Sequence, residues 1–319
     1  MDTRALGNTG LRIAPIVFGG NVFGWTLDEK QSFRILDAFV DRGFNAIDTA
    51  DAYSTWVPGN KGGESEAIIG NWLKARPALR DKVVVFTKVG SEMPGFTTRR
   101  DLSAKWIEEE VEHSLKRLGL ERIDLYFSHW PDPDTPYAET LGAYDRLIGA
   151  GKVKAIGCSN LDAGQLGEAL DVARAQGLPA YQVLQPEYNL YTRSSFEGPL
   201  ADLCIREGLG VVSYYALASG FLSGKYRSSE DFGRSPRGGG MGRYLNDRGR
   251  AILAALERAS LRHDARPAEI ALAWLLTRPG LTAPIASATT EEQIESFARA
   301  ARLKLDAEDL ADLDAASAL

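Results

Sequence analysis

The stretch Asp48-Thr-Ala-Asp-Ala-Tyr53 follows a short apolar run and marks the end of a predicted β-strand over residues 45–48. Three later predicted strands also end in polar side chains, at Phe86-Thr-Lys88, Tyr126-Phe-Ser-His129 and Gly157-Cys-Ser-Asn160. In a barrel of parallel strands, the residues at the carboxyl ends of the strands converge on one mouth. One cluster is therefore expected there, made of Asp48, Tyr53, Lys88 and His129.

Short apolar or β-branched segments alternate with helical patterns along the chain. The predicted strands are 16–19, 45–48, 83–88, 123–127, 153–159, 182–185, 211–215 and 283–286. The predicted helices are 28–42, 64–74, 101–118, 137–150, 162–176, 196–207, 248–276 (broken near Pro267) and 291–301. Eight alternations favour an α/β fold of the (β/α)8 TIM barrel type. Turn signals within residues 3–13 predict an N-terminal β-hairpin that plugs the barrel bottom.

The competing topology is an open, doubly wound sheet. No Gly-x-Gly-x-x-Gly follows the first strand and no change of composition marks a domain boundary. We therefore predict one domain over residues 1–319. The stretch 225–246, which is rich in glycine and arginine, is expected to be a long mobile loop at the barrel mouth. The alternative for this stretch is a disordered surface insertion without function.

Composition and charge narrow the class of protein. A net charge of −6 argues against nucleic acid or an anionic membrane as a partner. No run of about 18 apolar residues predicts a transmembrane helix, and the first residues lack the layout of a signal peptide. Cys158 and Cys204 do not indicate a disulfide framework, and with three scattered histidines they do not indicate a metal site. We expect a cytoplasmic protein, and the sequence leaves its oligomeric state open.

The four clustered side chains suit protonation of a carbonyl oxygen while hydride arrives at its carbon. Tyr53 is a protonated donor at neutral pH, and a nearby ammonium on Lys88 is expected to lower the pKa of that phenol. Asp48 would orient Lys88, and His129 would bind the substrate oxygen or move a proton. Taken singly, each residue has a structural alternative: a packing tyrosine, a solvated lysine, a turn-capping aspartate or a buried histidine. Their order along the chain favours catalysis.

An Asp with a Tyr five residues on, then a Lys, then a His, each after a successive strand, resembles the pattern of the aldo-keto reductase family. The resemblance covers nearly the whole chain. It implies an NAD(P)H-dependent oxidoreductase that reduces aldehydes or ketones to alcohols, reversibly, with Tyr53 as general acid. Family habit favours NADP(H). NAD(H) is the alternative, because no basic residue lies between Pro284 and Arg299 to bind a 2′-phosphate.

The resemblance also implies contacts to the dinucleotide. In the family, a Ser-Asn after the fifth strand and a Gln on the sixth hold the nicotinamide carboxamide. Tyr214 looks like the aromatic platform under the nicotinamide, and the stretch 220–225 resembles the segment that wraps the pyrophosphate. The stretch after the last strand commonly binds the 2′-phosphate or adenine ribose. The residues implied here are Ser159, Asn160, Gln185, Tyr214, Leu217, Gly220, Lys225, Ser287, Thr289 and Gln293.

Three tryptophans follow predicted strand ends and are candidates for the substrate pocket: Trp25, Trp56 and Trp130. Aromatic walls suit an apolar or sugar-like aldehyde or ketone. Packing under a loop is the alternative for Trp25 and Trp56, whereas Trp130 directly follows His129.

Two other functions remain under consideration. The same family includes channel-associated β subunits that bind nicotinamide with little or no turnover. A (β/α)8 enzyme of other chemistry, such as a phosphate-sugar isomerase, is disfavoured because no glycine-rich phosphate loop lies between the last two strands.

Overall fold

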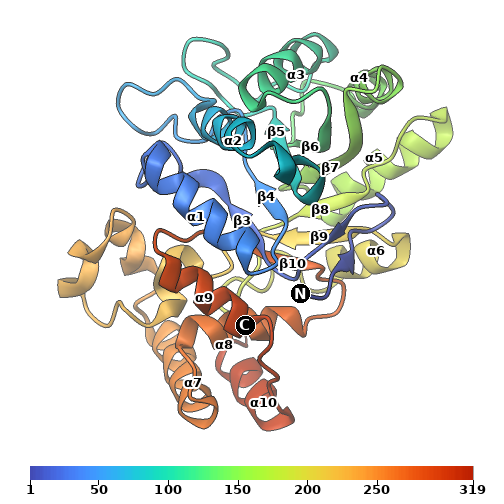
Figure 1. Cartoon of the computed structure of the whole chain (residues 1–319). Coiled ribbons are helices and arrows are strands. Elements are labelled where there is room, and N and C mark those ends of the chain that lie inside the picture. Colours follow the sequence, from blue (N-terminus) through green and yellow to red (C-terminus); the bar gives the residue numbers. More distant parts are fainter. Residues whose placement is uncertain (319) are drawn as a thin grey trace.

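Eight parallel strands close into a barrel in the computed structural model, which describes residues 1–318 (Figure 1). Neighbouring strands follow the order β10-β3-β4-β5-β6-β7-β8-β9. The bounds are β3 (Val17–Gly19), β4 (Ala46–Asp48), β5 (Val84–Val89), β6 (Ile123–Ser128), β7 (Val153–Ser159), β8 (Val183–Gln185), β9 (Gly210–Ser213) and β10 (Ala283–Ala286). The predicted TIM barrel is confirmed.

Helices surround this barrel, as Figure 1 shows. They are α1 (Glu29–Asp41), α2 (Glu64–Ala75), α3 (Ala104–Leu118), α4 (Tyr137–Gly149), α5 (Ala163–Gln176), α6 (Pro199–Glu207), α7 (Asp247–His263), α8 (Pro267–Leu276), α9 (Glu291–Ala300) and α10 (Ala307–Ala316). The predicted break before Pro267 separates α7 from α8, because the residue before a proline avoids the helical conformation. The helix α10 was not predicted; it begins at an Asp306 cap and buries Leu313. None of the helices within residues 1–318 is long and apolar enough to cross a membrane.

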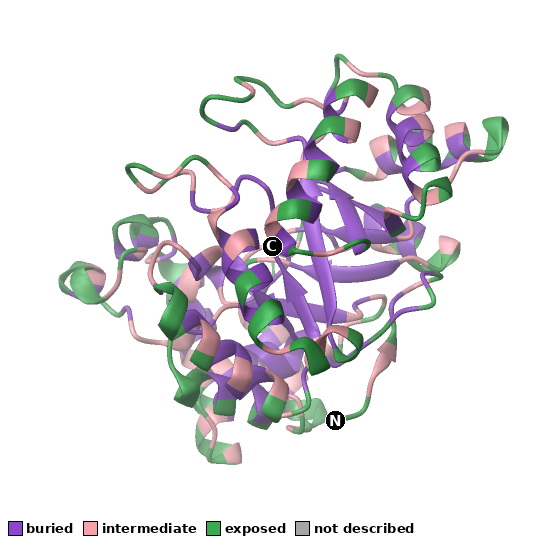
Figure 2. Cartoon of the chain, turned by 45° about the horizontal axis from the view of Figure 1, so that its top comes forward, coloured by how far each residue is buried: buried purple, intermediate pink, exposed green. Residues whose placement is uncertain are grey.

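Apart from the exposed Lys154 on β7, the barrel strands are buried on both faces, as the purple ribbons in the middle of Figure 2 show. One apolar cluster fills the barrel interior, and a larger one lies between the strands and the helices. Phe86 and Phe127 meet edge to face inside the barrel, with their ring centroids 6.1 Å apart. A Cβ at Gly157 on β7 would lie only 2.5 Å from the Phe127 ring, so this position requires glycine.

The N-terminal hairpin plugs the barrel bottom. Its strands β1 (Arg4–Ala5) and β2 (Arg12–Ile13) pair antiparallel, and Leu6, Leu11 and Ile13 join the interior cluster. Gly7 turns the chain with φ +51°, and a Cβ there would lie 2.3 Å from the backbone nitrogen of Gly210. The tight turn therefore seats the hairpin directly against the start of β9.

The stretch 225–246, yellow-orange at the left of Figure 1, contains regular structure where a mobile loop was expected. After the short helix η3 (Ala218–Ser223) come η4 (Ser229–Arg234) and η5 (Gly238–Arg243). The Asp231 carboxylate accepts hydrogen bonds from the backbone of Arg227 and Ser228, at 2.6 and 3.0 Å. Tyr244 is buried and stacks on Phe221, with centroids 5.2 Å apart. The stretch is thus anchored by side chains of its own.

Candidate active site

The four predicted catalytic residues meet at the carboxyl ends of neighbouring strands. Asp48 ends β4, Lys88 lies near the end of β5, His129 follows β6, and Tyr53 lies in the turn after β4. The Lys88 ammonium donates to Asp48 Oδ1 at 2.7 Å and Oδ2 at 2.8 Å. It also donates to the Tyr53 hydroxyl at 2.9 Å and to the Thr49 carbonyl at 2.8 Å. The predicted cluster therefore exists, and the barrel strands position it.

Lys88 is completely buried, and Asp48 is almost so. Removing two charges from water is unfavourable unless they are paired and hydrogen bonded. All three ammonium protons have acceptors here, which meets that condition. Burial lowers the pKa of Lys88, while the Asp48 carboxylate acts in the opposite direction. The pair is thus held in one geometry with little freedom to rearrange.

The pKa of Tyr53 differs from the expectation. The expected effect of Lys88 was to lower it, but burial and then the Asp48 carboxylate raise the pKa of Tyr53 well above its ordinary value. Burial disfavours the charged phenolate, and the Tyr53 hydroxyl donates a hydrogen bond to Asp48 Oδ2 at 2.9 Å, beside a carboxylate that repels a negative charge. Tyr53 therefore holds its proton firmly at neutral pH, as a general acid must before reaction.

His129 lies beside Tyr53, with their ring centroids 6.0 Å apart. Burial, followed by the charges of Lys88 and Arg100, lowers the pKa of His129 well below its ordinary value, so the ring is neutral at pH 7. Its Nδ1 atom is buried and has no hydrogen-bond partner within residues 1–318. A neutral imidazole offers one donor and one acceptor nitrogen, so His129 keeps hydrogen-bonding capacity for a ligand.

The residues predicted to hold the carboxamide also support the catalytic cluster. Gln185 Nε2 donates to Asp48 Oδ1 at 2.9 Å, and Asn160 Nδ2 donates to the His129 carbonyl at 2.9 Å. The Tyr214 hydroxyl donates to Asn160 Oδ1 at 2.7 Å, which fixes the Tyr214 ring. These amides therefore connect the cluster to the ends of β7, β8 and β9.

A cavity of about 1160 Å³ opens at this mouth. Asp48, Tyr53 and His129 line it, whereas Lys88 is sealed behind them. The structure brings every predicted cofactor and substrate residue to its wall: Trp25, Trp56, Trp130, Ser159, Asn160, Gln185, Tyr214, Leu217, Gly220, Lys225, Ser287, Thr289 and Gln293. The cavity thus extends from the catalytic cluster to the N-terminal end of α9. Such a helix end favours anionic groups.

The three tryptophans surround the catalytic side of the cavity. Trp25 packs edge to face on Trp56 with centroids 5.6 Å apart, and Trp56 lies 6.3 Å from the Tyr53 ring. Trp130 stacks on His129 at 5.8 Å. Trp56 is 49% exposed, so its ring is available to a ligand at the entrance.

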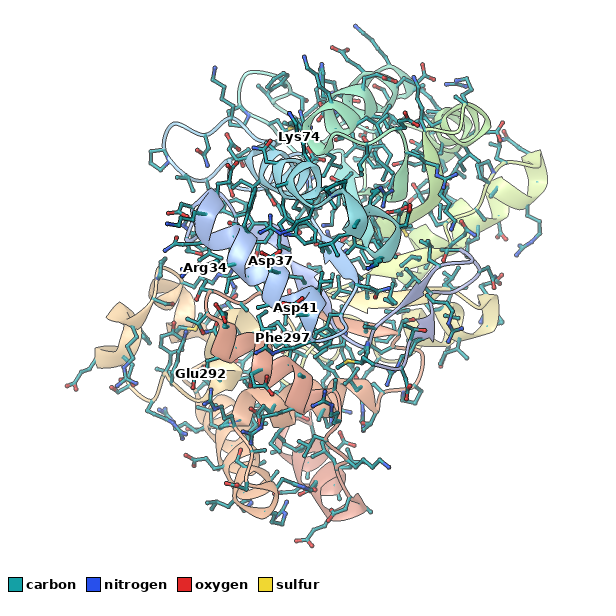
Figure 3. All side chains as sticks on the ribbon, viewed as in Figure 1. Arg34, Asp37, Asp41, Lys74, Glu292 and Phe297 are labelled. Carbon is teal, nitrogen blue, oxygen red and sulfur yellow. The ribbon has the colours of Figure 1, made fainter. Side chains whose placement is uncertain are left out.

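Sequence reasoning missed several charged residues on the cavity wall: Glu187, Arg234, Arg237 and Arg266. Arg266 supplies a cation to this wall, although the sequence has no basic residue between Pro284 and Arg299. It comes from the start of α8 and pairs with Glu292, which Figure 3 labels at the start of α9. The cation is close in space and distant in sequence, so a search between Pro284 and Arg299 could not find it.

Within residues 1–318, no group of histidine, cysteine, aspartate and glutamate side chains is arranged to hold a metal ion. Cys158 and Cys204 are free and buried.

Known proteins resemble this chain over nearly its whole length. A model of the Aldo/keto reductase family matches residues 15–318. The uncharacterized oxidoreductase YrpG of Bacillus subtilis is 35% identical over 312 residues, covering 97% of this chain and 93% of that protein. Aldo-keto reductase YhdN of the same organism is 31% identical over 323 residues, covering 98% and 93%. A probable voltage-gated potassium channel subunit beta of Arabidopsis thaliana is 32% identical over 306 residues, covering 94% and 91%.

Proposed function

Because this chain belongs to the aldo/keto reductase family, we propose that it is an NAD(P)H-dependent oxidoreductase. It reduces an aldehyde or ketone to the alcohol, and the reaction is reversible. The observation that carries the proposal is the hydrogen-bonded set of Asp48, Tyr53 and Lys88, of which Asp48 and Tyr53 line a large cavity together with His129.

The residues of the cluster divide the proton chemistry between them. A bound nicotinamide dinucleotide supplies the hydride for reduction, or accepts it for oxidation. Tyr53 gives its proton to the carbonyl oxygen during reduction and takes it back during oxidation. Lys88 stabilises the phenolate that Tyr53 leaves, and Asp48 keeps Lys88 charged and oriented.

His129 has a different role, which follows from its neutral ring. A neutral imidazole can donate a hydrogen bond to the carbonyl oxygen and orient it toward Tyr53. It adds no positive charge that would compete with Lys88. Asn160 supports this role because it bonds the His129 backbone carbonyl.

The cavity wall has the groups that a dinucleotide needs. Ser159, Asn160 and Gln185 would hold the carboxamide, and the fixed ring of Tyr214 would lie against the nicotinamide. Backbone N–H groups near Gly220 and the Lys225 ammonium suit a pyrophosphate. Ser287, Thr289 and Gln293 lie where α9 begins. Arg266 at the same end supports the preference for NADP(H) over NAD(H).

The test is a fluorescence titration of the purified protein with NADPH and NADH, followed by turnover with a panel of small aldehydes. We expect tight binding of one dinucleotide and loss of its nicotinamide absorbance with at least one aldehyde. Failure to bind either dinucleotide would contradict the proposal.

A second candidate is a nicotinamide-binding regulatory subunit. Its support is the similarity to the Arabidopsis thaliana protein named as a probable channel subunit beta, and to a rice protein of the same name that is 33% identical. This candidate would be favoured if the wild-type protein bound a nicotinamide dinucleotide but reduced none of the aldehydes in the panel.

A further inference from the structure

We propose that Arg237 forms an anion-binding subsite for the substrate, so that the preferred carbonyl compound carries a carboxylate. The inference rests on the proposed function, because it names the substrate class of the same cavity.

Arg237 lies between η4 and η5 and lines the cavity. Its guanidinium stacks over the Trp25 ring, 5.1 Å from the centroid. Its Nη2 donates to Asn21 Oδ1 at 3.3 Å, a long hydrogen bond to a neutral acceptor. Most of the five N–H donors of a guanidinium therefore remain available to a ligand.

Four cations line the cavity, and their partners differ. Arg234 pairs with Asp231 at 2.8 Å, and Arg266 pairs with Glu292. Lys225 lies over the Tyr226 ring in the stretch proposed to bind the pyrophosphate. Within residues 1–318, Arg237 has no carboxylate partner. A partly desolvated cation without a counter-ion is unfavourable, and an anionic ligand would remove that cost.

Arg237 is also close to the catalytic cluster. Burial lowers the pKa of Arg237, and the phenol groups of Tyr215, Tyr226 and Tyr53 act on it in the opposite direction. Trp25, which stacks under Arg237, is linked through Trp56 to Tyr53. The guanidinium, the two indoles and the phenol therefore surround one part of the cavity.

This arrangement suits an elongated substrate. Such a substrate would place its carbonyl group at Tyr53 and His129. Its apolar body would lie against the tryptophans, and its carboxylate would bind Arg237. Glu187, whose carboxylate would repel such a ligand, follows β8 and forms an isolated backbone bridge with Tyr214. Its charge raises the pKa of Tyr214 and Tyr244, and Glu187 forms no ion pair with Arg237 within residues 1–318.

A phosphate of the dinucleotide is the other anion that could reach Arg237. Asn21 Oδ1 also accepts from Ser287 Oγ at 2.8 Å, and Ser287 is one of the proposed dinucleotide contacts. Both ligands share the same chemistry, so the experiment must separate them.

The first arm compares 4-carboxybenzaldehyde with 4-methylbenzaldehyde, which have similar shape and differ in charge. We expect wild-type protein to prefer the carboxylate. Arg237→Met should lower the ratio of the two kcat/KM values by about 10- to 100-fold, the range for loss of a charge-assisted hydrogen bond. Arg237→Lys keeps the cation and should retain part of the preference. Arg227→Met removes an equal charge from the same stretch, at a residue that pairs with Glu257 and does not line the cavity, and should leave the ratio within about threefold of wild type.

Asn21→Asp is a variant that keeps Arg237 and places a carboxylate beside it. This internal counter-ion should occupy the guanidinium and lower the ratio as Arg237→Met does. The variant keeps the inference testable if Arg237→Met destabilises the stretch.

The second arm measures binding without turnover. Calorimetric titration with 4-(hydroxymethyl)benzoate should show dissociation constants about 10- to 100-fold weaker for Arg237→Met than for wild type. Fluorescence titration with NADPH should show a much smaller change.

Unchanged aldehyde ratios and unchanged binding of 4-(hydroxymethyl)benzoate in Arg237→Met would overturn the inference. The inference would also be overturned if Arg237→Met weakened only the affinity for NADPH, because Arg237 would then bind the dinucleotide and not the substrate. If wild-type protein reduces neither aldehyde but binds 4-(hydroxymethyl)benzoate through Arg237, the proposed function fails and the subsite stands.

Discussion

The barrel mouth has two sides that are built differently. The strand side consists of Asp48, Lys88, His129 and Gln185, which lie on strands or directly after them. The loop side consists of Lys225, Arg234, Arg237 and Arg266, which lie on the stretch 225–246 and at the start of α8. On the strand side, polar groups bond across neighbouring elements of the barrel, as Lys88 and Gln185 both do to Asp48. On the loop side, ion pairs form within the stretch 225–246, as between Arg234 and Asp231, or between the starts of two helices, as between Arg266 and Glu292.

The difference determines what each side can do. Lys88 is fully buried and its position is fixed by the parallel register that pairs it with Phe127. A side chain held in this way suits catalysis, because a small displacement of a catalytic group lowers the reaction rate strongly. The loop-side cations are partly exposed, and not all of them pair with a carboxylate. They can therefore bind charged ligands. Changes on the strand side should therefore alter rates, and changes on the loop side should alter affinity and selectivity.

Tyr53→Phe should have the largest effect. It removes the proposed general acid and keeps the ring, so kcat for aldehyde reduction should fall by about 10²- to 10⁴-fold. The dissociation constant for NADPH should stay within about twofold of wild type. Tyr191→Phe is the matched control, because that hydroxyl bonds to the Arg243 carbonyl and does not line the cavity. A Tyr53→Phe protein that keeps more than a tenth of wild-type activity would contradict the acid role.

The pH dependence of reduction tests the protonation states of Tyr53 and His129 at the catalytic end of the cavity. The active forms are protonated Tyr53, whose pKa is raised, and neutral His129, whose pKa is lowered. The rate therefore falls as pH rises through the raised pKa of Tyr53, and as pH drops through the lowered pKa of His129. Between about pH 6.5 and 9, kcat/KM should be flat, since the ordinary values are about 6.5 and 10. An inflection near pH 6.5 would show that His129 titrates like an exposed histidine.

The same contrast explains what the sequence could predict. The strand ends at Asp48, Lys88 and Ser159 were predicted because a barrel brings successive strand ends together whatever the loops do. The break before Pro267 followed from local chemistry. The side chains of Asp48 and Lys88 were expected to pair, and they do.

The features that the sequence did not predict depend on contacts between distant segments. The pKa of Tyr53 rises because the phenol is buried and because it lies against the Asp48 carboxylate, and both depend on the three-dimensional arrangement. Arg266, at the start of α8, lines the cavity and pairs with Glu292 in the first turn of α9. The stretch 225–246 folds around Asp231 and Tyr244, although its glycines suggested a mobile loop.

Lys225→Met should have an intermediate effect and change affinity. Loss of the ammonium should weaken binding of NADPH and NADH alike by about tenfold, because the pyrophosphate is common to both. The fall in kcat at saturating dinucleotide should be much smaller than the change in affinity. Lys304→Met removes the same charge from an exposed site outside the cavity and is the control in parallel fluorescence titrations. If kcat fell while the affinity for NADPH and NADH stayed unchanged, Lys225 would act in catalysis. The distinction between a catalytic strand side and a ligand-binding loop side would then be wrong.

Glu292→Gln should have the smallest effect and the most selective one. The change frees Arg266 from its carboxylate partner, so the guanidinium becomes available to a 2′-phosphate. We expect the ratio of the NADH to the NADPH dissociation constant to rise by about two- to fivefold, the scale of a partly exposed ion pair. Glu291→Gln is the matched control, because it removes an equal charge from the same first turn of α9, where Glu291 has no ion-pair partner within residues 1–318. If both variants shift the ratio equally, the cause is the general charge at the helix end, and the selectivity of the loop side does not depend on Arg266.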